Sequence, residues 1–123
     1  MTEISAFTIL VCGSRGFADY ETVANCLATY DNGAPNHIIS GGCPSGADRL
    51  VEIFVARHQD WTITVVPADW TTHGKKAGFI RNQQMIDMNP DLVLAFWDGA
   101  SRGTAHTLNL AKKRKIPTLI VYH

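Results

Sequence analysis

Five segments of the chain combine apolar residues with the β-branched and aromatic types that strands favour. The first of them, Phe7–Cys12, is an almost continuous apolar run, which is typical of a central strand buried on both faces. We predict the remaining strands at His37–Ser40, Thr62–Val66, Asp91–Trp97 and Thr118–Tyr122.

Between these strands, apolar positions recur every three or four residues, as they do along an amphipathic helix. Asp19 is a candidate N-cap for the first helix, and Ser45 and Asp48 have the spacing of a capping box at the start of the second. A third, less cleanly amphipathic helix is predicted around Ala77–Met88. The predicted inward-facing positions are Tyr20, Val23, Leu27 and Tyr30 in the first helix, Ala47, Leu50, Val51, Phe54 and Val55 in the second, and Ala105, Leu108 and Ala111 in the last.

Strands that alternate with helices along the whole chain predict a parallel sheet with right-handed crossover connections and helices on both faces. We therefore expect an α/β fold, a Rossmann-like three-layer sandwich around a five-stranded parallel sheet. The favoured strand order is 3-2-1-4-5, because it places the first and fourth strands side by side where the winding direction reverses. A chain of 123 residues has room for one such domain, residues 1–123.

Three glycine-rich segments each follow a predicted strand and precede a predicted helix. They are Gly13-Ser14-Arg15-Gly16, Gly41-Gly42-Cys43-Pro44-Ser45-Gly46 and Asp98-Gly99-Ala100-Ser101-Arg102-Gly103-Thr104. Glycine lets the backbone turn and approach an anion closely, and a helix that follows presents unpaired N–H groups and the positive end of its dipole. The two segments with a Ser-Arg pair follow the first and fourth strands, so both lie at the expected switch point. The sequence thus predicts a nucleotide-phosphate site there, although neither segment has the Gly-x-Gly-x-x-Gly form of NAD dehydrogenases.

Composition narrows the classes of function. Eleven basic and eleven acidic residues cancel, so the chain lacks the overall positive charge that gathers nucleic acid nonspecifically. Cys12, Cys26 and Cys43 are odd in number and lack the paired spacing of a zinc site, so we expect reduced thiols. We predict neither a metal nor a cofactor. The start of the chain, Met1–Ile4, has neither a basic region nor a long apolar run, which favours a cytoplasmic protein.

Four motifs, taken in order, resemble a known family. They are Gly13-Ser14-Arg15, Gly41-Gly42-x-x-x-Gly46-Ala47-Asp48, Ala77-Gly78-x-x-Arg81-Asn82-x-x-Met85 and Arg102-Gly103-Thr104. Across nearly the whole chain they look like the YspA-like branch of the SLOG superfamily, which also includes the LOG phosphoribohydrolases and the DNA-processing protein DprA. The resemblance implies a Rossmann-like sheet that binds nucleotides or nucleotide-derived signals, and a tendency to self-associate.

The chain departs from the enzyme branch at one position. LOG enzymes carry Pro-Gly-Gly-x-Gly-Thr-x-x-Glu, whose glutamate works with an arginine, here matched by Arg81, to cleave the N-glycosidic bond of a nucleoside monophosphate. Aligning Gly103 and Thr104 with that motif puts Thr107 at the glutamate position, with His106 beside it. Threonine cannot act as a carboxylate base or stabilise a developing cation by charge. The departure favours binding over hydrolysis of the LOG type.

Charged and aromatic residues in and near these segments are the candidates for ligand contacts. Arg15 and Arg102 suit phosphate, because the planar guanidinium matches its geometry and each arginine has glycines nearby at a helix start. In the long connection Pro67–Lys76, Lys75 or its neighbour would add charge to a phosphate and Trp70 would cover a base, unless the connection is a plain surface loop.

Other candidates have structural interpretations that compete with the functional ones. Asp48 either contacts a ribose hydroxyl or serves the capping box, and Asp98 either binds a sugar hydroxyl or starts a turn. His106 either contacts the ligand or is a satisfied histidine, and Trp97 either stacks on a base or belongs to the core. The predicted ligand-binding set is Gly13, Ser14, Arg15, Gly41, Gly42, Asp48, Trp70, Lys75, Arg81, Asn82, Trp97, Asp98, Gly99, Ser101, Arg102, Gly103, Thr104 and His106, and the catalytic candidates are His106, Arg81 and Asp98.

The leading hypothesis is a small protein that senses or sequesters a nucleotide or nucleotide-derived molecule, for example an ADP-ribose-type signal. The alternative is an N-glycosidic-bond hydrolase that uses His106 or Asp98 in place of the glutamate. A DprA-like partner of single-stranded nucleic acid is disfavoured by the zero net charge. We also predict at least a homodimer, formed through the helix after Gly78. That helix presents more apolar surface than one inward-facing stripe requires, through Phe79, Ile80, Met85, Ile86 and Met88. The run Lys112–Lys115 is interpreted as a solvated helix end.

Overall fold

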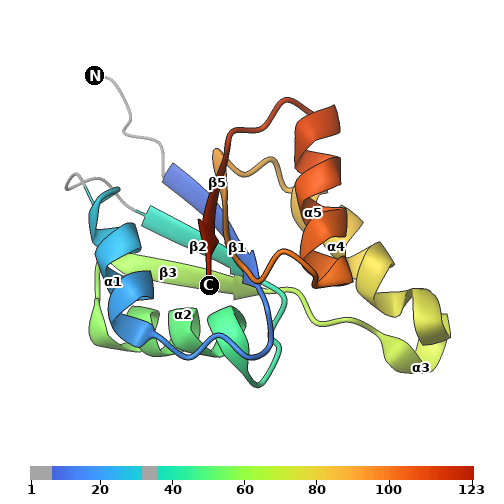
Figure 1. Cartoon of the computed structure of the whole chain (residues 1–123), viewed down its shortest axis with the longest axis horizontal. Coiled ribbons are helices and arrows are strands. Elements are labelled where there is room, and N and C mark those ends of the chain that lie inside the picture. The colour runs from blue at the N-terminus through green and yellow to red at the C-terminus, as the bar shows by residue number, and fades with distance from the viewer. Residues whose placement is uncertain (1–6, 32–35) are drawn as a thin grey trace.

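Five strands of this computed structural model, which describes residues 7–31 and 36–123, pair in parallel to form one sheet (Figure 1). They are β1 (Phe7–Gly13), β2 (Asn36–Ser40), β3 (Trp61–Val65), β4 (Leu92–Trp97) and β5 (Thr118–Tyr122). Their order across the sheet is β3-β2-β1-β4-β5, which confirms the predicted Rossmann-like topology. No strand bound differs from the prediction by more than one residue.

Helices cover both faces of this sheet, so the fold has three layers (Figure 1). The helices α1 (Tyr20–Ala28) and α2 (Gly46–Arg57) pack on one face, and α4 (Ala77–Asp87) and α5 (Arg102–Lys113) pack on the other. A short helix, α3 (Trp70–His73), and a 3-10 turn, η1 (Gly74–Lys76), precede α4. In the described ranges, no helix has both the length and the apolar composition needed to cross a bilayer.

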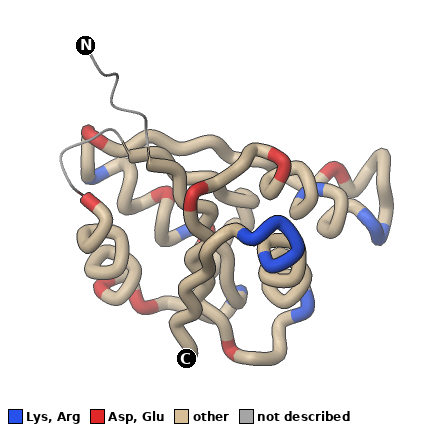
Figure 2. The backbone as a smooth tube through the Cα atoms, turned by 90° about the horizontal axis from the view of Figure 1, so that it is seen from above, with Lys and Arg blue, Asp and Glu red and all other residues tan. Residues whose placement is uncertain are grey.

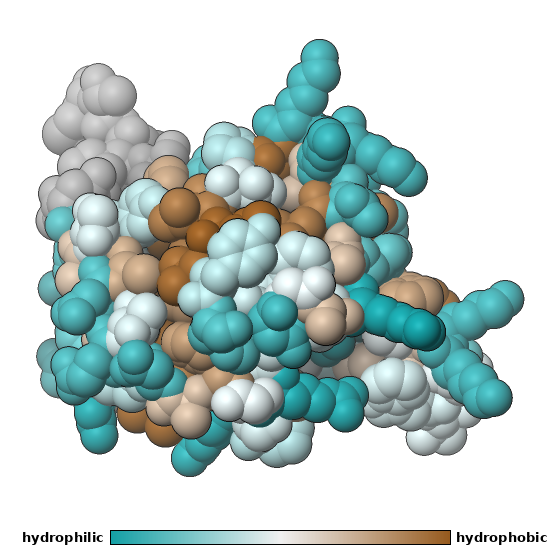
Figure 3. Space-filling model, in the orientation of Figure 1, coloured by the Kyte–Doolittle hydropathy of each residue, from teal (hydrophilic) through white to brown (hydrophobic). Residues whose placement is uncertain are grey.

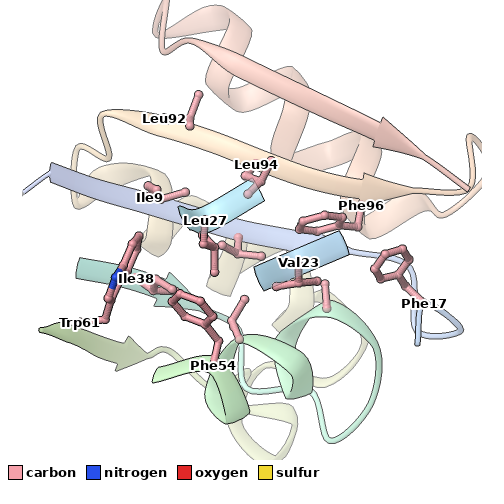
Figure 4. Close-up of a cluster of buried hydrophobic side chains, with 13 residues drawn as sticks. Ile9, Phe17, Val23, Leu27, Ile38, Phe54, Trp61, Leu92, Leu94 and Phe96 are labelled. Atoms are coloured by element: carbon pink, nitrogen blue, oxygen red, sulfur yellow. The ribbon is translucent and has the colours of Figure 1, made fainter. Parts of the chain in front are cut away.

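The pleat of β1 divides the core into two clusters. Ile9 and Val11 pack with residues of α1 and α2, whereas Leu10 and Cys12 pack with residues of α4 and α5. All four side chains are buried, which explains why the β1 segment is apolar at successive positions. The larger cluster is drawn in Figure 4, where Ile9, Phe17, Val23, Leu27, Ile38, Phe54, Trp61, Leu92, Leu94 and Phe96 are labelled.

Local signals at helix starts were partly right. A carboxylate oxygen of Asp19 accepts a hydrogen bond from the Thr22 amide at 3.2 Å, which confirms Asp19 as the N-cap of α1. The capping box predicted for α2 is wrong, because the Ser45 side chain makes no capping bond and Asp48 instead accepts from the Cys43 amide at 3.0 Å. Ser45 and Asp48 have the spacing of a capping box, but the Asp48 carboxylate accepts its hydrogen bond from an amide of the preceding loop.

The connection Pro67–Lys76, which the sequence suggests is a long loop, is mostly helical. A carboxylate oxygen of Asp69 accepts from the Thr72 amide at 3.0 Å and caps α3. This one-turn helix and η1 bring the chain directly into α4. The connection is therefore a structured extension of α4 (Figure 1).

Two helices bury residues other than those expected. In α5, Ala111 is buried as predicted, but Thr104 and Thr107 are buried while Ala105 and Leu108 are only half-buried. In α4, Met85 and Ile86 lie in the core, so among the residues named for a dimer contact only Phe79 and Met88 are largely exposed. The apolar surface that suggested self-association through α4 is consequently smaller than the sequence indicated.

The remaining surface shows two features. Apolar side chains reach the surface near the edge strand β5, where Leu119 and Tyr122 are exposed (Figure 3). The run Lys112–Lys115 forms a block of basic residues at the C-terminal end of α5 (Figure 2). This position fits a cationic end that complements the negative pole of the helix dipole.

Candidate functional site

A cavity of about 880 Å³ lies at the carboxyl edge of the sheet. The loops that follow β1, β2 and β4 form most of its wall, and the first turns of α2 and α5, the β3–α4 connection and α4 complete it. The wall consists of Gly13, Ser14, Arg15, Gly16, Gly41, Gly42, Cys43, Pro44, Ser45, Asp48, Pro67, Ala68, Trp70, Arg81, Asp98, Ser101, Arg102, Gly103 and Thr104. All three glycine-rich segments singled out in the sequence thus meet around one space.

Most residues predicted to bind a ligand are in this wall, and Lys75, Asn82, Trp97, Gly99 and His106 are not. The sequence prediction omitted Gly16, Cys43, Pro44, Ser45, Pro67 and Ala68, which are in the wall. The first four belong to glycine-rich segments, so treating each segment as a whole would have included them. The last two follow β3 at the same edge of the sheet, a position that the strand order implies.

Ser14 joins the loop after β1 to the loop after β4. Its amide donates to the Phe96 carbonyl at 2.9 Å, and its hydroxyl oxygen accepts from the Asp98 amide at 2.9 Å. The side chain is buried, with 4% exposed. Ser14 is thus part of the frame of the cavity, and the arginine beside it belongs to a loop that two hydrogen bonds join to the end of β4.

Asp98 organises the approach to α5. Its Oδ1 accepts from the amides of Ala100 at 2.9 Å and Ser101 at 2.8 Å. These amides hold the pKa of the exposed Asp98 carboxyl below its usual value. Asp98 therefore acts as the turn former that the sequence allowed as one of its two interpretations.

The first turn of α5 is open toward the cavity. In the part of the chain that the structure describes, no side chain caps the amides of Arg102, Gly103 and Thr104, and all three residues line the cavity. Four amides at a helix start lack intrahelical acceptors and carry the positive end of the helix dipole. The α5 N-terminus is therefore suited to receive an anion.

Two arginines flank this helix start. Arg15 and Arg102 line the cavity and are exposed. The ion pairs found among the described residues are Arg49–Glu52 and Arg114–Asp87, so neither cavity arginine is neutralised by one. We call Arg15, Arg102 and the first turn of α5 the cationic side of the cavity.

Arg81, which also lines the cavity, is held in place by hydrogen bonds within the protein. Its Nη1 donates to the Gly41 carbonyl at 2.8 Å, and its Nε donates to Asn82 Oδ1 at 3.0 Å. A Cβ atom at position 41 would lie only 2.4 Å from this Nη1, so the close approach of Arg81 requires glycine there. We call Gly41 and Arg81, together with Asn82 behind them, the anchored side of the cavity.

Asn82 connects the anchored side to α5 from behind the wall. Because Arg81 Nε can only donate, the Asn82 amide group is oriented with its Nδ2 toward the Gly103 carbonyl at 3.3 Å and His106 Nδ1 at 3.2 Å. His106 must then accept at Nδ1, which requires its neutral form. Burial, and to a lesser degree Lys113, lower the pKa of His106 and favour that form.

Asp48 supplies a half-buried carboxylate to the cavity wall. Its Oδ2 accepts from the Cys43 amide at 3.0 Å. Burial raises the pKa of the Asp48 carboxyl, and the Cys43 amide and Arg81 oppose that change. Within the described residues, no group of three or more His, Cys, Asp or Glu side chains is arranged to hold a metal ion.

The two tryptophans predicted to contact a base lie in different places. Trp70 lines the cavity from α3 with 56% of its surface exposed, so its ring is available to a ligand. Trp97 donates from Nε1 to the Ser101 carbonyl at 3.1 Å and lies in a separate hollow between α5 and β5. Trp97 supports the loop before α5 from outside the cavity.

Comparison with known proteins identifies the chain's relatives. The family model described as "YspA, cpYpsA-related SLOG family" matches residues 7–73. The chain belongs to this SLOG family. The Gene 61 protein of Mycobacterium phage D29 is 35% identical over 116 residues, which cover 90% of this chain and 93% of that protein. The C-terminal domain of a Pyrococcus furiosus hydrogenase shares the fold, with a TM-score of 0.53 at 14% identity, over 98% of this chain and 96% of that one.

Membership of the SLOG family connects the chain with nucleotide-related binding or processing in general terms. The match covers the loops after β1 and β2, and it ends before Arg81 and the cationic first turn of α5.

The residue at the LOG glutamate position is turned away from the cavity of this SLOG protein. Thr107 is 1% exposed, its hydroxyl donates to the Gly103 carbonyl at 3.3 Å, and it is absent from the cavity wall. Of the catalytic candidates, Arg81 and Asp98 line the cavity, whereas His106 lies behind Asn82. The ring centroid of His106 is 4.4 Å from that of Phe79, which contributes to its burial.

Proposed function

We propose that this SLOG protein binds a nucleotide or nucleotide-derived molecule in the cavity, with the phosphate on the cationic side. The observation that carries the proposal is the uncapped first turn of α5 lying in one wall with Arg15 and Arg102. Helix amides and guanidinium groups both bind phosphate through charge-assisted hydrogen bonds. The volume of about 880 Å³ falls in the range of cavities that hold small organic ligands.

The rest of the wall fits the other parts of such a ligand. Trp70 offers an exposed aromatic face on which a base can stack. The balance of charge also suits a single bound anion, because three arginines and two aspartates line the cavity. The chain as a whole carries no net charge, so an anion would be attracted by local groups such as these arginines and not by an overall positive field.

Calorimetry with nucleoside monophosphates, nucleoside diphosphates and dinucleotides tests the proposal. Arg15→Ala and Arg102→Ala are each expected to weaken binding by about 1.5–3 kcal/mol, the scale of a hydrogen bond to a charged group. Arg49→Ala is the matched control, because Arg49 is an exposed arginine on α2 that is outside the cavity wall. Unchanged affinity in both cavity variants would rule out phosphate binding at this place.

We further propose that the protein binds its ligand without cleaving it. Asp98 is committed to the amides before α5, and Thr107 cannot provide the charge that steadies a developing cation. Incubation with nucleoside monophosphates, NAD and ADP-ribose should therefore release neither free base nor ribose phosphate, as chromatography would show. Efficient base release that Arg81→Ala abolishes would favour the hydrolase instead.

Self-association remains a prediction. The exposed positions Phe79 and Met88 are available for a contact through α4. Light scattering at micromolar concentration is expected to report at least a dimer, and Phe79→Ser should shift the population toward monomer. A wild-type protein that is monomeric under these conditions would contradict the prediction.

A further inference from the structure

A half-buried carboxylate is unexpected in a cavity built to receive an anion. Of the two acidic residues in the wall, Asp98 has its Oδ1 occupied by two loop amides. Asp48 lies elsewhere, in the first turn of α2 next to Gly41 and Arg81. A phosphate placed against Asp48 would meet a like charge, whereas Arg15 and Arg102 offer positive charge elsewhere in the wall, so we expect Asp48 to face a different group of the ligand.

The hydrogen bonds of Asp48 leave acceptor capacity for a ligand. Its Oδ2 accepts from the Cys43 amide at 3.0 Å, and the buried hydroxyl of Ser40 is also a partner. An ionised carboxylate has about four lone-pair sites and no proton to donate. The nearby guanidinium of Arg81 donates to the Gly41 carbonyl and Asn82. Asp48 can therefore take further hydrogen bonds, and only from a ligand group that donates.

Because of the strand order, the groups of the wall follow one another along the cavity in the same order as the parts of a nucleotide. Across the sheet edge, Arg102 follows β4, Arg15 follows β1, Asp48 follows β2 and Trp70 follows β3. Neighbouring strands are about 4.8 Å apart, so these groups succeed one another along the cavity. Phosphate, sugar and base succeed one another in a nucleotide in the same way. The position of Asp48, between the phosphate groups and the aromatic ring, is that of the sugar.

We propose that Asp48 accepts hydrogen bonds from the 2′- and 3′-hydroxyls of the bound nucleotide and makes the site selective for ribonucleotides over their deoxy counterparts. The inference rests on the proposed function and names the class of ligand within it. Asp48 acts here as a carboxylate. The charged or titratable groups near it are Arg81 from α4, Glu52 from its own helix and Cys12 from β1.

Calorimetry tests this with ribonucleoside 5′-diphosphates of the four common bases and their 2′-deoxy and 2′,3′-dideoxy counterparts. EDTA is present, so that no metal ion bridges Asp48 to a phosphate. For the base that binds best, the wild-type protein should prefer the ribonucleotide over the dideoxy form by about tenfold or more, since a hydrogen bond to a charged acceptor is lost. Asp48→Asn should reduce that ratio to within about threefold, because a neutral acceptor binds more weakly.

Two controls make the result specific to Asp48. Asp60→Asn changes an exposed aspartate that is outside the wall, and it should leave the ratio unchanged. Pyrophosphate should bind Asp48→Asn at least as tightly as wild type, which shows that the variant is folded and the cationic side intact.

The outcomes distinguish this inference from the proposed function. Nucleotides that bind with equal affinity whatever their sugar would overturn the role of Asp48 and leave phosphate binding standing. A ribose preference that survives in Asp48→Asn would assign the selectivity to another residue. Failure of every nucleotide and of pyrophosphate to bind the wild-type protein would overturn the proposed function, and this inference with it.

Discussion

The two sides of the cavity differ in how far the protein satisfies its own polar groups. On the anchored side, Arg81 and Asn82 form hydrogen bonds with each other and with Gly41, Gly103 and His106. On the cationic side, Arg15 and Arg102 are exposed, and no described side chain caps the first turn of α5. The difference separates two roles: the anchored side determines the shape of the site, and the cationic side keeps its donors available for a ligand.

The largest effect is expected where α2 meets the loop of the cationic side. Gly46 has φ +70°, and a Cβ atom there would lie 2.4 Å from the Ser14 carbonyl oxygen. Gly46→Ala should lower the free energy of unfolding by about 3 kcal/mol, because backbone strain and a steric clash add. Chemical denaturation measures this, and Gly103→Ala is the control, since nothing lies within 4 Å of a Cβ placed there. Equal stability of the two variants would show that the loops are not locked together.

A smaller loss is expected on the anchored side. Asn82 is 4% exposed, and Asn82→Ala would leave Arg81 Nε and His106 Nδ1 without this partner. The expected cost is about 1–3 kcal/mol of stability. Arg15→Ala and Arg102→Ala should change stability by less than about 0.5 kcal/mol, as exposed substitutions usually do. If the exposed arginines proved as important for stability as Asn82, the distinction between the two sides would fail.

The smallest expected effect is the dependence of stability on pH. The pKa of His106 is lowered from 6.5 in the folded protein, so the unfolded chain binds more protons between that lower value and pH 6.5. Stability should consequently fall as the pH falls through this window, because protonation of Nδ1 breaks the contact with Asn82. His106→Gln should flatten part of the dependence in denaturation curves recorded across the window. The pKa of His37 is lowered by burial as well, so some dependence remains in that variant.

Much of the fold was predictable because its signals are local. Period and residue type fixed all five strands to within one residue, and the strand order followed from alternation and handedness. The helical turn at Trp70–His73 was missed, although Asp69 as a possible cap was a local sign of it. The outward position of Trp97 was also foreseeable, since Val93 and Ala95, on the same face of β4, pack toward α4 and α5.

The supporting bonds of the site could not be predicted in this way. Ser14 pairs with Asp98 across 84 positions, and Asn82 pairs with His106 across 24. Residue type indicated that these groups belong near the site, but which of them face a ligand and which hold the frame depends on the packing of α4 against α5. For that reason His106 and Asn82 were assigned to the ligand, whereas they lie behind the wall.

The most direct test of the central claim follows the backbone amides of the protein during titration with a nucleoside diphosphate, using ¹H–¹⁵N correlation spectra. If the phosphate lies on the cationic side, the amide signals of Arg102, Gly103 and Thr104 should shift most, and pyrophosphate should reproduce those shifts. The signals of the Asn82 and Phe96 amides should move less, because their surroundings are fixed by the protein. Ligand-induced shifts that leave the first turn of α5 unchanged would contradict the account.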